Sequence, residues 1–183
     1  MGWIQTFTGM RIDPRNITAD QVQIEDIAHA LANKCRFSGH CDPFYSVADH
    51  SMRVAALVGA PHKLYALLHD AAEAYLPDVP TPLKEYFGEL EGLECRVMAA
   101  IRGKFMPNWM ASGATREIVK FADLSMLAAE RRDLLPHVDG WDPAVQLYID
   151  VSGRIEPLIP SAAKRLYLEQ LTAAIEAAKA GQS

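Results

Sequence analysis

The sequence lacks features that disulfide-rich, membrane-spanning, secreted and nucleic-acid-binding proteins require. Its 183 residues include three cysteines, Cys35, Cys41 and Cys95, an odd number that is too small for a disulfide framework. No apolar run reaches the roughly 18 residues that a membrane span needs, and no basic segment followed by an apolar one suggests a signal peptide. The net charge of −5 is not the basic excess that nucleic acids and anionic membranes attract. These absences predict a cytoplasmic protein that binds neither nucleic acid nor membrane.

Two of the cysteines flank His40 in the segment CRFSGHC, residues 35–41. Cysteine and histidine together raise the alternative of a zinc site. The spacing matches no common zinc pattern, so the segment favours ordinary thiols.

Apolar residues at helical spacing indicate an all-α fold. Half of the residues are hydrophobic and the length suits one domain, so we expect a single bundle of about six helices over residues 1–183. Residues 1–20 are expected to form an extended N-terminal arm, and residues 106–113 a loop. The predicted helices cover residues 23–35, 45–58, 62–76, 82–105, 114–135 and 162–180. Gly59–Pro61 separates the second helix from the third, and Pro136 ends the fifth.

The predicted third helix carries an unusual group of ionisable side chains. At 100° per residue, His69, Asp70 and Glu73 lie within roughly a 100° arc opposite the apolar stripe. No Lys or Arg occurs between Lys63 and Lys84, although an exposed helical face usually mixes charges of both signs. A solvated face and a functional face are both consistent with this pattern.

Two of the other predicted helices carry polar residues on their apolar stripes. His50 lies at the edge of the stripe of the second helix, where it is either a satisfied core histidine or a metal ligand. Asp123 lies within the stripe of the fifth helix, and Glu130, two turns later, is interpreted as a supporting or structural carboxylate. A carboxylate directed into a core is costly unless Arg, Lys or a metal ion meets it. Arg36 is the candidate for a structural ion pair with Asp123.

Two histidines and two aspartates on three helices together suit a divalent ion. We predict that His50, His69, Asp70 and Asp123 bind one transition metal ion at a site between the helices. Imidazole and carboxylate donors favour Co, Mn, Zn, Fe or Ni. The order of a histidine, a His-Asp pair and an aspartate resembles the signature of the HD phosphohydrolase superfamily, whose members are all-helical and bind one or more divalent metals.

The resemblance covers most of the chain and is greatest to small bacterial 5′-deoxynucleotidases and related bacteriophage enzymes, some of which are dATP triphosphohydrolases. These proteins share an Arg-aromatic pair ahead of the first metal-binding histidine, which Arg36 and Phe37 match, although several relatives have Trp at the second position. They also share the block HDxxExxxxDxPxPxK. The block is matched by His69, Asp70, Glu73, Asp78, Pro80, Pro82 and Lys84.

The resemblance implies roles for residues outside the ligand set. Glu73 is expected to act as general acid or base, and Asp78 to contact the sugar or direct the attacking water. Arg36 and Lys84 are expected to bind phosphate, and a second metal ion is expected to arrive with the substrate phosphates. Phe37 is expected to pack on the sugar or base. The structural alternatives are a core aromatic at Phe37 and an ordinary exposed lysine at Lys84.

The implied function is metal-dependent hydrolysis of the 5′-phosphate ester of 2′-deoxynucleotides. The small size, the short interval between the first two metal-binding histidines and the opening WIQTFTG favour a phage-type dATP hydrolase. One alternative is a 5′-deoxynucleotidase for deoxynucleoside monophosphates of several bases. Another is a non-catalytic HD module that binds a nucleotide for regulation, although such a module need not retain Glu73. The resemblance also implies a homo-oligomer, dimeric or larger, in the host cytoplasm if the protein is phage-encoded.

Overall fold

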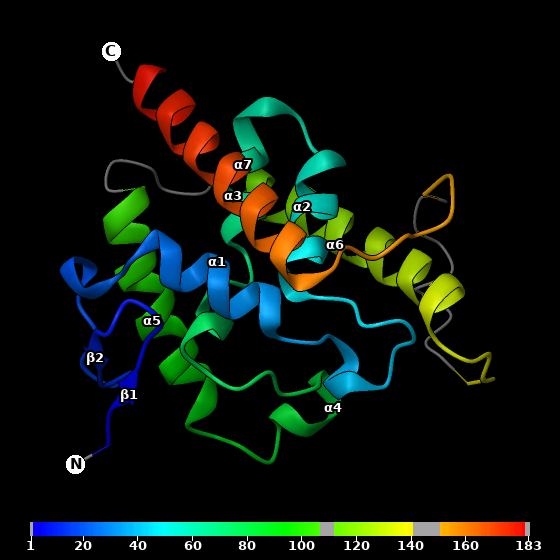
Figure 1. Ribbon diagram of the computed structural model, residues 1–183, viewed down its shortest axis with the longest axis horizontal. Helices are drawn as coiled ribbons and strands as arrows, with labels where there is room; N and C mark the ends of the chain where they lie inside the picture. Colours follow the sequence, from blue (N-terminus) through cyan, green and yellow to red (C-terminus); the bar gives the residue numbers. More distant parts are fainter. Residues whose placement is uncertain (1, 107–111, 141–150, 182–183) are drawn as a thin grey trace.

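Helices account for most of the structure, a computed structural model that describes residues 2–106, 112–140 and 151–181 (Figure 1). The α-helices are α1 (Ile24–Asn33), α2 (Val47–Ala56), α3 (Lys63–Leu68), α4 (Thr81–Lys84), α5 (Leu90–Phe105), α6 (Gly113–Leu134) and α7 (Pro160–Ala180). Short 3₁₀ turns are η1 (Ala19–Gln21), η2 (Phe37–Gly39), η3 (Ala60–His62) and η4 (Ala71–Ala74). Within these described ranges the one sheet is an antiparallel pair, β1 (Ile4–Gln5) and β2 (Arg11–Ile12). The prediction of an all-α fold is confirmed.

Helix α2 lies at the centre of the bundle. It packs against α1, α3, α6 and α7. Eight of its ten residues are buried, among them Met52, Val54 and the polar His50. Its first turn is fixed by Ser46, whose side chain accepts a hydrogen bond from the Asp49 amide at 3.1 Å. Because helices surround α2, a histidine in the middle of this helix is fully enclosed.

The two longest described helices, α6 and α7, agree with the predicted ones. Ser112 caps α6 by accepting a backbone hydrogen bond at 3.1 Å, and the helix ends two residues before Pro136. Pro160 lies in the first turn of α7, where no N–H is needed. The buried Tyr167 of α7 donates a hydrogen bond to the Leu67 carbonyl at 2.6 Å and so ties α7 to α3. No helix in the described part of the chain combines the length and the apolar character that crossing a membrane requires.

The prediction of one continuous helix over residues 62–76 is wrong. The chain is helical up to Leu68, turns at His69 and Asp70, and resumes as η4. Nδ1–H of His69 donates a hydrogen bond to the Ala66 carbonyl at 2.7 Å, the acceptor that the Asp70 amide would use in an unbroken helix. At this turn Oδ2 of Asp70 lies 3.2 Å from Nε2 of His69, so the two adjacent side chains reach the same site.

The predicted helix over residues 82–105 is also wrong as one element, because it is divided into two. The single turn of α4 ends at Lys84, and α5 begins only at Leu90. The backbone between them makes tight i to i−3 hydrogen bonds, and Gly88, a poor helix former, lies in this stretch. The loop predicted for residues 106–113 falls largely outside the described residues.

A small hairpin replaces part of the extended arm that was predicted for residues 1–20. Gly9 turns the chain between β1 and β2 with a φ of 87°, a value that favours glycine. Thr8 fixes the hairpin to α1, because its amide and hydroxyl donate hydrogen bonds to the buried Asp26 carboxylate at 2.7 and 2.9 Å. The extension of one domain over the whole chain stays a prediction.

Candidate metal centre

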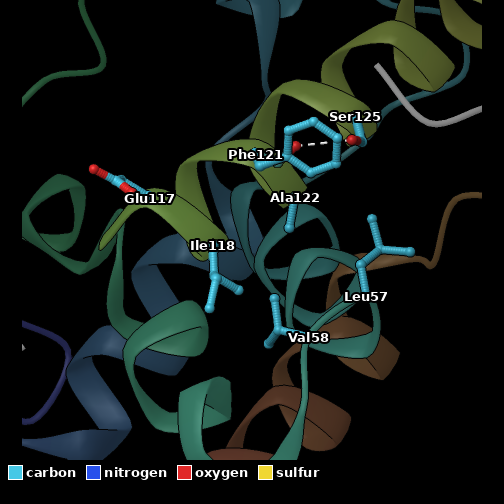
Figure 2. A pocket seen from close by; sticks show the side chains of 7 residues that line it. All are labelled: Leu57, Val58, Glu117, Ile118, Phe121, Ala122 and Ser125. Carbon is cyan, nitrogen blue, oxygen red and sulfur yellow. Dashed lines mark hydrogen bonds between the residues drawn. The ribbon is translucent and has the colours of Figure 1, made fainter. Parts of the chain in front are cut away.

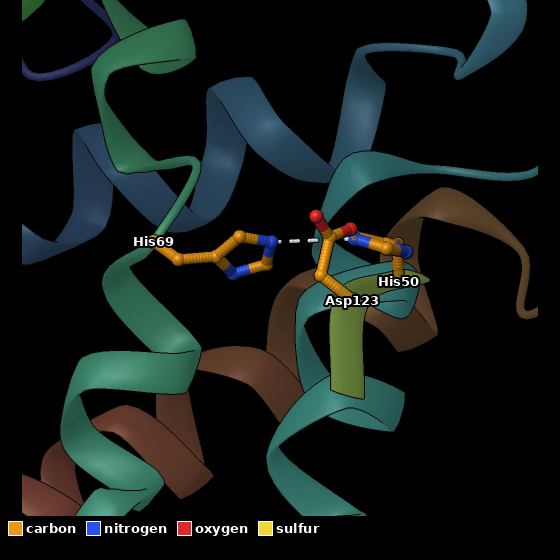
Figure 3. A group of neighbouring side chains, drawn as sticks. All are labelled: His50, His69 and Asp123. Carbon is orange, nitrogen blue, oxygen red and sulfur yellow. Dashed lines mark hydrogen bonds and ion pairs between the residues drawn. The ribbon is translucent and has the colours of Figure 1, made fainter. Parts of the chain in front are cut away.

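The side chains of His50 and His69 meet between α2 and the turn that follows α3 (Figure 3). Their Nε2 atoms are 3.3 Å apart. His69 carries a proton on Nδ1, because the Ala66 carbonyl at 2.7 Å can only accept a hydrogen bond. Nδ1 of His50 donates in the same way to Oε1 of Glu130, at 2.6 Å. Both Nε2 atoms therefore face one point between the helices.

Two aspartates complete this group. Oδ1 of Asp123, from α6, is 3.3 Å from Nε2 of His50. Oδ2 of Asp70 is 3.2 Å from Nε2 of His69 and 3.8 Å from Nε2 of His50. One donor atom each from His50, His69 and Asp123 lie within 4.8 Å of one another. The structure thus brings together the four residues that were predicted as metal ligands.

The donor set fits a divalent transition metal ion. Two nitrogen atoms that each bind one ion at about 2.1 Å lie roughly 3.0–3.4 Å apart, and the Nε2 atoms of His50 and His69 show this separation at 3.3 Å. Paired imidazoles and carboxylates suit Zn, Co, Mn, Fe and Ni. The residues therefore fit the predicted kind of ion, while a second ion stays a prediction.

A buried ion pair between Arg36 and Glu130 supports His50 at Nδ1, the ring nitrogen that does not face the ligand group. Glu130 of α6 is fully buried and accepts hydrogen bonds from Nη2 and Nε of Arg36 at 2.9 and 3.1 Å, besides the one from His50. Burial raises the pKa of Glu130, but the charges of His50 and Arg36 outweigh it and lower this pKa. Such a carboxylate fixes the orientation of a metal-binding imidazole. The structural partner of Arg36 is thus Glu130 and not Asp123, which instead contacts Lys120 at 2.8 Å.

When no ion is bound, the candidate metal ligands shift one another's pKa values strongly. Burial and Arg36 lower the pKa of His50, but Glu130 and Asp123 outweigh them and raise it to about 9. Burial raises the pKa of Asp123, yet its hydrogen bond to His50 and the nearby charges hold that pKa well below the usual range. Burial also raises the pKa of Asp70, but the charge of His69 and its hydrogen bond outweigh burial and lower this pKa. At neutral pH His50 therefore holds a proton that a metal ion would displace.

Glu73 lies beside this group, in an unusual environment for a carboxylate. Its Oε2 atom is buried and has no hydrogen-bond partner among the described residues. Burial, and then the charges of Asp70 and Asp78, raise the pKa of Glu73 to about 8 from an ordinary 4.5. Without a bound ion, Glu73 therefore holds its proton to a higher pH than an ordinary carboxyl group does.

Lys34 belongs to this site although its sequence position did not indicate it. From the end of α1, its ammonium donates hydrogen bonds to the carbonyls of Glu73 and Leu76, the latter at 2.5 Å. Burial lowers the pKa of Lys34, and the charges of Glu73 and Asp78 oppose this effect. Lys34 thereby holds the turn that carries Glu73. A lysine at the end of a helix is common, so the sequence offered no signal that could distinguish this one.

The predicted phosphate and sugar contacts lie around the ligand group. Nη1 of Arg36 is 3.8 Å from Oδ2 of Asp70. The half-buried ring of Phe37 has its centroid 5.3 Å from the Arg36 guanidinium. Lys84 is ion-paired with Glu94 at 3.0 Å; burial lowers the pKa of Lys84, but Glu94 and the more distant site carboxylates outweigh it and raise this pKa. The roles of these residues toward a substrate stay predictions.

A separate pocket of about 400 Å³ lies between the end of α2 and α6 (Figure 2). Its walls include Leu57, Val58, Ile118 and Phe121. The charged residue among those that line it is Glu117, which is acidic. An apolar pocket with an acidic residue does not suit a phosphate group.

A helical bundle that gathers a histidine, a His-Asp pair and an aspartate from separate elements is HD-like in fold and in ligand chemistry. Comparison with known proteins then shows the family.

The uncharacterized protein YfdR of Escherichia coli (strain K12) is 38% identical over 178 residues, which cover 93% of this chain and 94% of YfdR. An uncharacterized Rhodobacter capsulatus protein is 36% identical over 131 residues, 66% of this chain and 67% of that protein. No model of a known protein family matches the chain. The chain belongs to the same family as YfdR.

A more distant relative carries a functional name. A Vibrio parahaemolyticus protein named as a 5′-deoxynucleotidase is 32% identical over 110 residues, which cover 58% of this chain. The match spans 48% of the Vibrio protein, about half of its length.

Proposed function

We propose that this protein is a metal-dependent phosphohydrolase that cleaves the 5′-phosphate ester of 2′-deoxynucleoside monophosphates. The observation that carries the proposal is the meeting of His50, His69, Asp70 and Asp123 beside the buried carboxyl group of Glu73, whose pKa is raised. The name of the Vibrio relative supports the deoxynucleotide substrate class. It also favours the monophosphate alternative over the phage-type dATP hydrolase, which none of the three reported relatives is named as.

The residues of this chain divide the chemistry between them. When bound, a divalent ion supplies Lewis acidity at a phosphoryl oxygen and an activated water as nucleophile. Glu73 donates its proton to the leaving O5′. Nη1 of Arg36 and the ammonium of Lys84 neutralise the phosphate oxygens. Phe37 packs on the sugar or base, and Asp78 contacts the sugar near its 3′ end or directs the water.

The environment of Glu73 favours an enzyme over a non-catalytic nucleotide-binding module. A buried carboxyl group without a hydrogen-bond partner destabilises the fold. A module that only binds a nucleotide gains nothing from it, whereas a general acid needs a pKa near the working pH. The proposal includes a cytoplasmic homo-oligomer and, when substrate is bound, a second metal ion.

A substrate panel tests this proposal. Separate samples of the protein are reconstituted with Co²⁺, Mn²⁺ or Zn²⁺. Each is incubated with the four deoxynucleoside monophosphates, the matching ribonucleotides, dADP and dATP, and the products are separated by chromatography. We expect deoxynucleosides and inorganic phosphate from the deoxy monophosphates. Equal cleavage of ribonucleotides would refute the deoxynucleotide assignment, and tripolyphosphate released from dATP would restore the phage-type alternative.

The matched variants are Glu73→Gln and, as a control, Glu176→Gln at an exposed position on α7. Glu73→Gln should retain bound metal and lose at least about a hundredfold in kcat, the scale of one general acid. Glu176→Gln should match the wild type in both measurements. Normal turnover by Glu73→Gln would assign the proton donor elsewhere, with Asp78 as the next candidate.

A further inference from the structure

Cys35 and Cys41 lie side by side at the edge of the candidate site. Their Sγ atoms are 3.5 Å apart, and both are free thiols. Cys41 is 8% exposed, and Cys35 is partly exposed. A disulfide has an S–S distance of about 2.05 Å, so an approach of about 1.5 Å would join the two sulfurs.

The turn between the two cysteines connects them to the metal centre. The backbone of Cys35 is held by a β-bridge to Ser46. The turn that follows contains Arg36 and then Phe37 and Ser38, whose φ values of 53° and 51° are ones that residues other than glycine rarely adopt. Because one side of the turn is held, a change in cysteine spacing has to be absorbed within this strained segment.

We propose that Cys35 and Cys41 are a redox-active dithiol that hydroperoxides convert to a disulfide, and that this conversion displaces Arg36. The guanidinium of Arg36 holds Glu130 at 2.9 Å, and Glu130 holds Nδ1 of His50 at 2.6 Å. Two hydrogen-bonded steps therefore link the dithiol to the candidate metal ligand. The effect on nucleotide turnover rests on the proposed function, whereas formation of the disulfide does not.

The two thiols have different parts in the oxidation. Burial raises the pKa of the Cys41 thiol to about 11, so Cys41 keeps its proton. Cys35 is the more exposed of the two thiols, so a hydroperoxide reaches its sulfur first. Cys35 attacks one peroxide oxygen, the O–O bond breaks, and a sulfenic acid forms while the other oxygen leaves as water or alcohol. The Cys41 sulfur then attacks the Cys35 sulfur, the S–O bond breaks, and hydroxide leaves as water with the Cys41 proton. Two thiols and one hydroperoxide give one disulfide, one water and one water or alcohol.

Thiol counting tests the first half of the proposal. The full-length protein carries Cys95→Ser, because Cys95 is an exposed third thiol on α5. Hydrogen peroxide in the presence of a chelator should remove both remaining thiols and lower the intact mass by two hydrogens, and dithiothreitol should restore both. Thiols that persist, or a mass that gains oxygen without a disulfide, would overturn the proposal.

Metal affinity and turnover test the second half. The same protein is reduced, oxidised or re-reduced, desalted, titrated with Co²⁺, and assayed with dAMP. Oxidation should weaken Co²⁺ binding and lower kcat by at least about threefold each, since loss of a partner that orients a metal ligand weakens metal sites. Re-reduction should restore both quantities. A disulfide that forms with neither quantity changed would overturn the switch.

The matched control is Cys35→Ser in the same Cys95→Ser background, which leaves the buried Cys41 alone. Each variant is compared with its own untreated sample, and Cys35→Ala is the substitute if the serine variant folds poorly. The control should lose neither Co²⁺ affinity nor kcat after peroxide, and an equal loss would assign the effect to another target. If the wild type hydrolyses no nucleotide, the proposed function fails, while the thiol count and the Co²⁺ titration still decide about the dithiol.

Discussion

Replacing Glu73 by Gln should stabilise the metal-free protein at alkaline pH while removing its activity. The carboxyl group of Glu73 is buried beside Asp70 and Asp78, and its Oε2 atom has no hydrogen-bond partner among the described residues. Ionising it in the folded chain is therefore unfavourable, whereas the glutamine amide of nearly the same shape carries no charge. A catalytic carboxyl group of this kind reduces the stability of the fold in which it is placed.

The sign and size of the change in the free energy of unfolding follow from the pKa values of Glu73 in the unfolded and the folded chain. In the unfolded chain the carboxyl group loses its proton near pH 4.5, and in the folded chain only at about pH 8. Between these values the folded state binds the additional proton, so stability falls as the pH rises through the window and the loss is complete above it. The difference between the two pKa values sets a ceiling of about 5 kcal/mol. Partial solvent access to Glu73 reduces the expected gain in Glu73→Gln to about 2 kcal/mol.

Urea denaturation with a chelator present measures this gain. At about pH 9 Glu73→Gln should exceed the wild type in free energy of unfolding by about 2 kcal/mol, and at about pH 4 the two should agree. The exposed Glu176→Gln should follow the wild type at both pH values. A gain that is absent at high pH, or that is the same at both, would refute the account of Glu73.

Three further predictions concern the groups around the metal centre. Glu130→Gln should weaken Co²⁺ binding by about tenfold to a hundredfold, because Glu130 orients His50; equilibrium dialysis measures this, and unchanged affinity would contradict it. Binding of Co²⁺ at neutral pH should release about one proton, and the affinity should rise with pH until about pH 9, because bound metal displaces the proton of His50; calorimetry in buffers of different ionisation enthalpy checks this. Lys34→Met should lower the free energy of unfolding by about 1–3 kcal/mol, because two partly buried carbonyls lose their donor. Urea denaturation compares it with the exposed Lys63→Met, and equal stability would refute the prediction.

The ends of the long helices could be predicted because local chemistry sets them. Ser112 starts α6 and Pro136 follows its end, and Pro160 opens α7. The break at His69 could not be predicted in this way. Leu and Ala on both sides of it favour a helix, and a side-chain hydrogen bond together with the distant Lys34 overrides this propensity.

The sequence by itself determined the helical class of the fold and the four donor residues of the candidate metal centre. The helical class follows from the apolar period within each segment. The donor residues follow from the order of a histidine, a His-Asp pair and an aspartate along the chain, which resembles a known signature. Only the tertiary structure decided that Arg36 holds Glu130, that Lys34 holds the turn of Glu73, and that two thiols lie 3.5 Å apart. The Arg36–Glu130 bond joins residues 94 positions apart, and the Lys34–Glu73 bond residues 39 apart. Such contacts leave no periodic trace in a chain, because they arise only when the packing of α1, α2 and α6 brings the groups together.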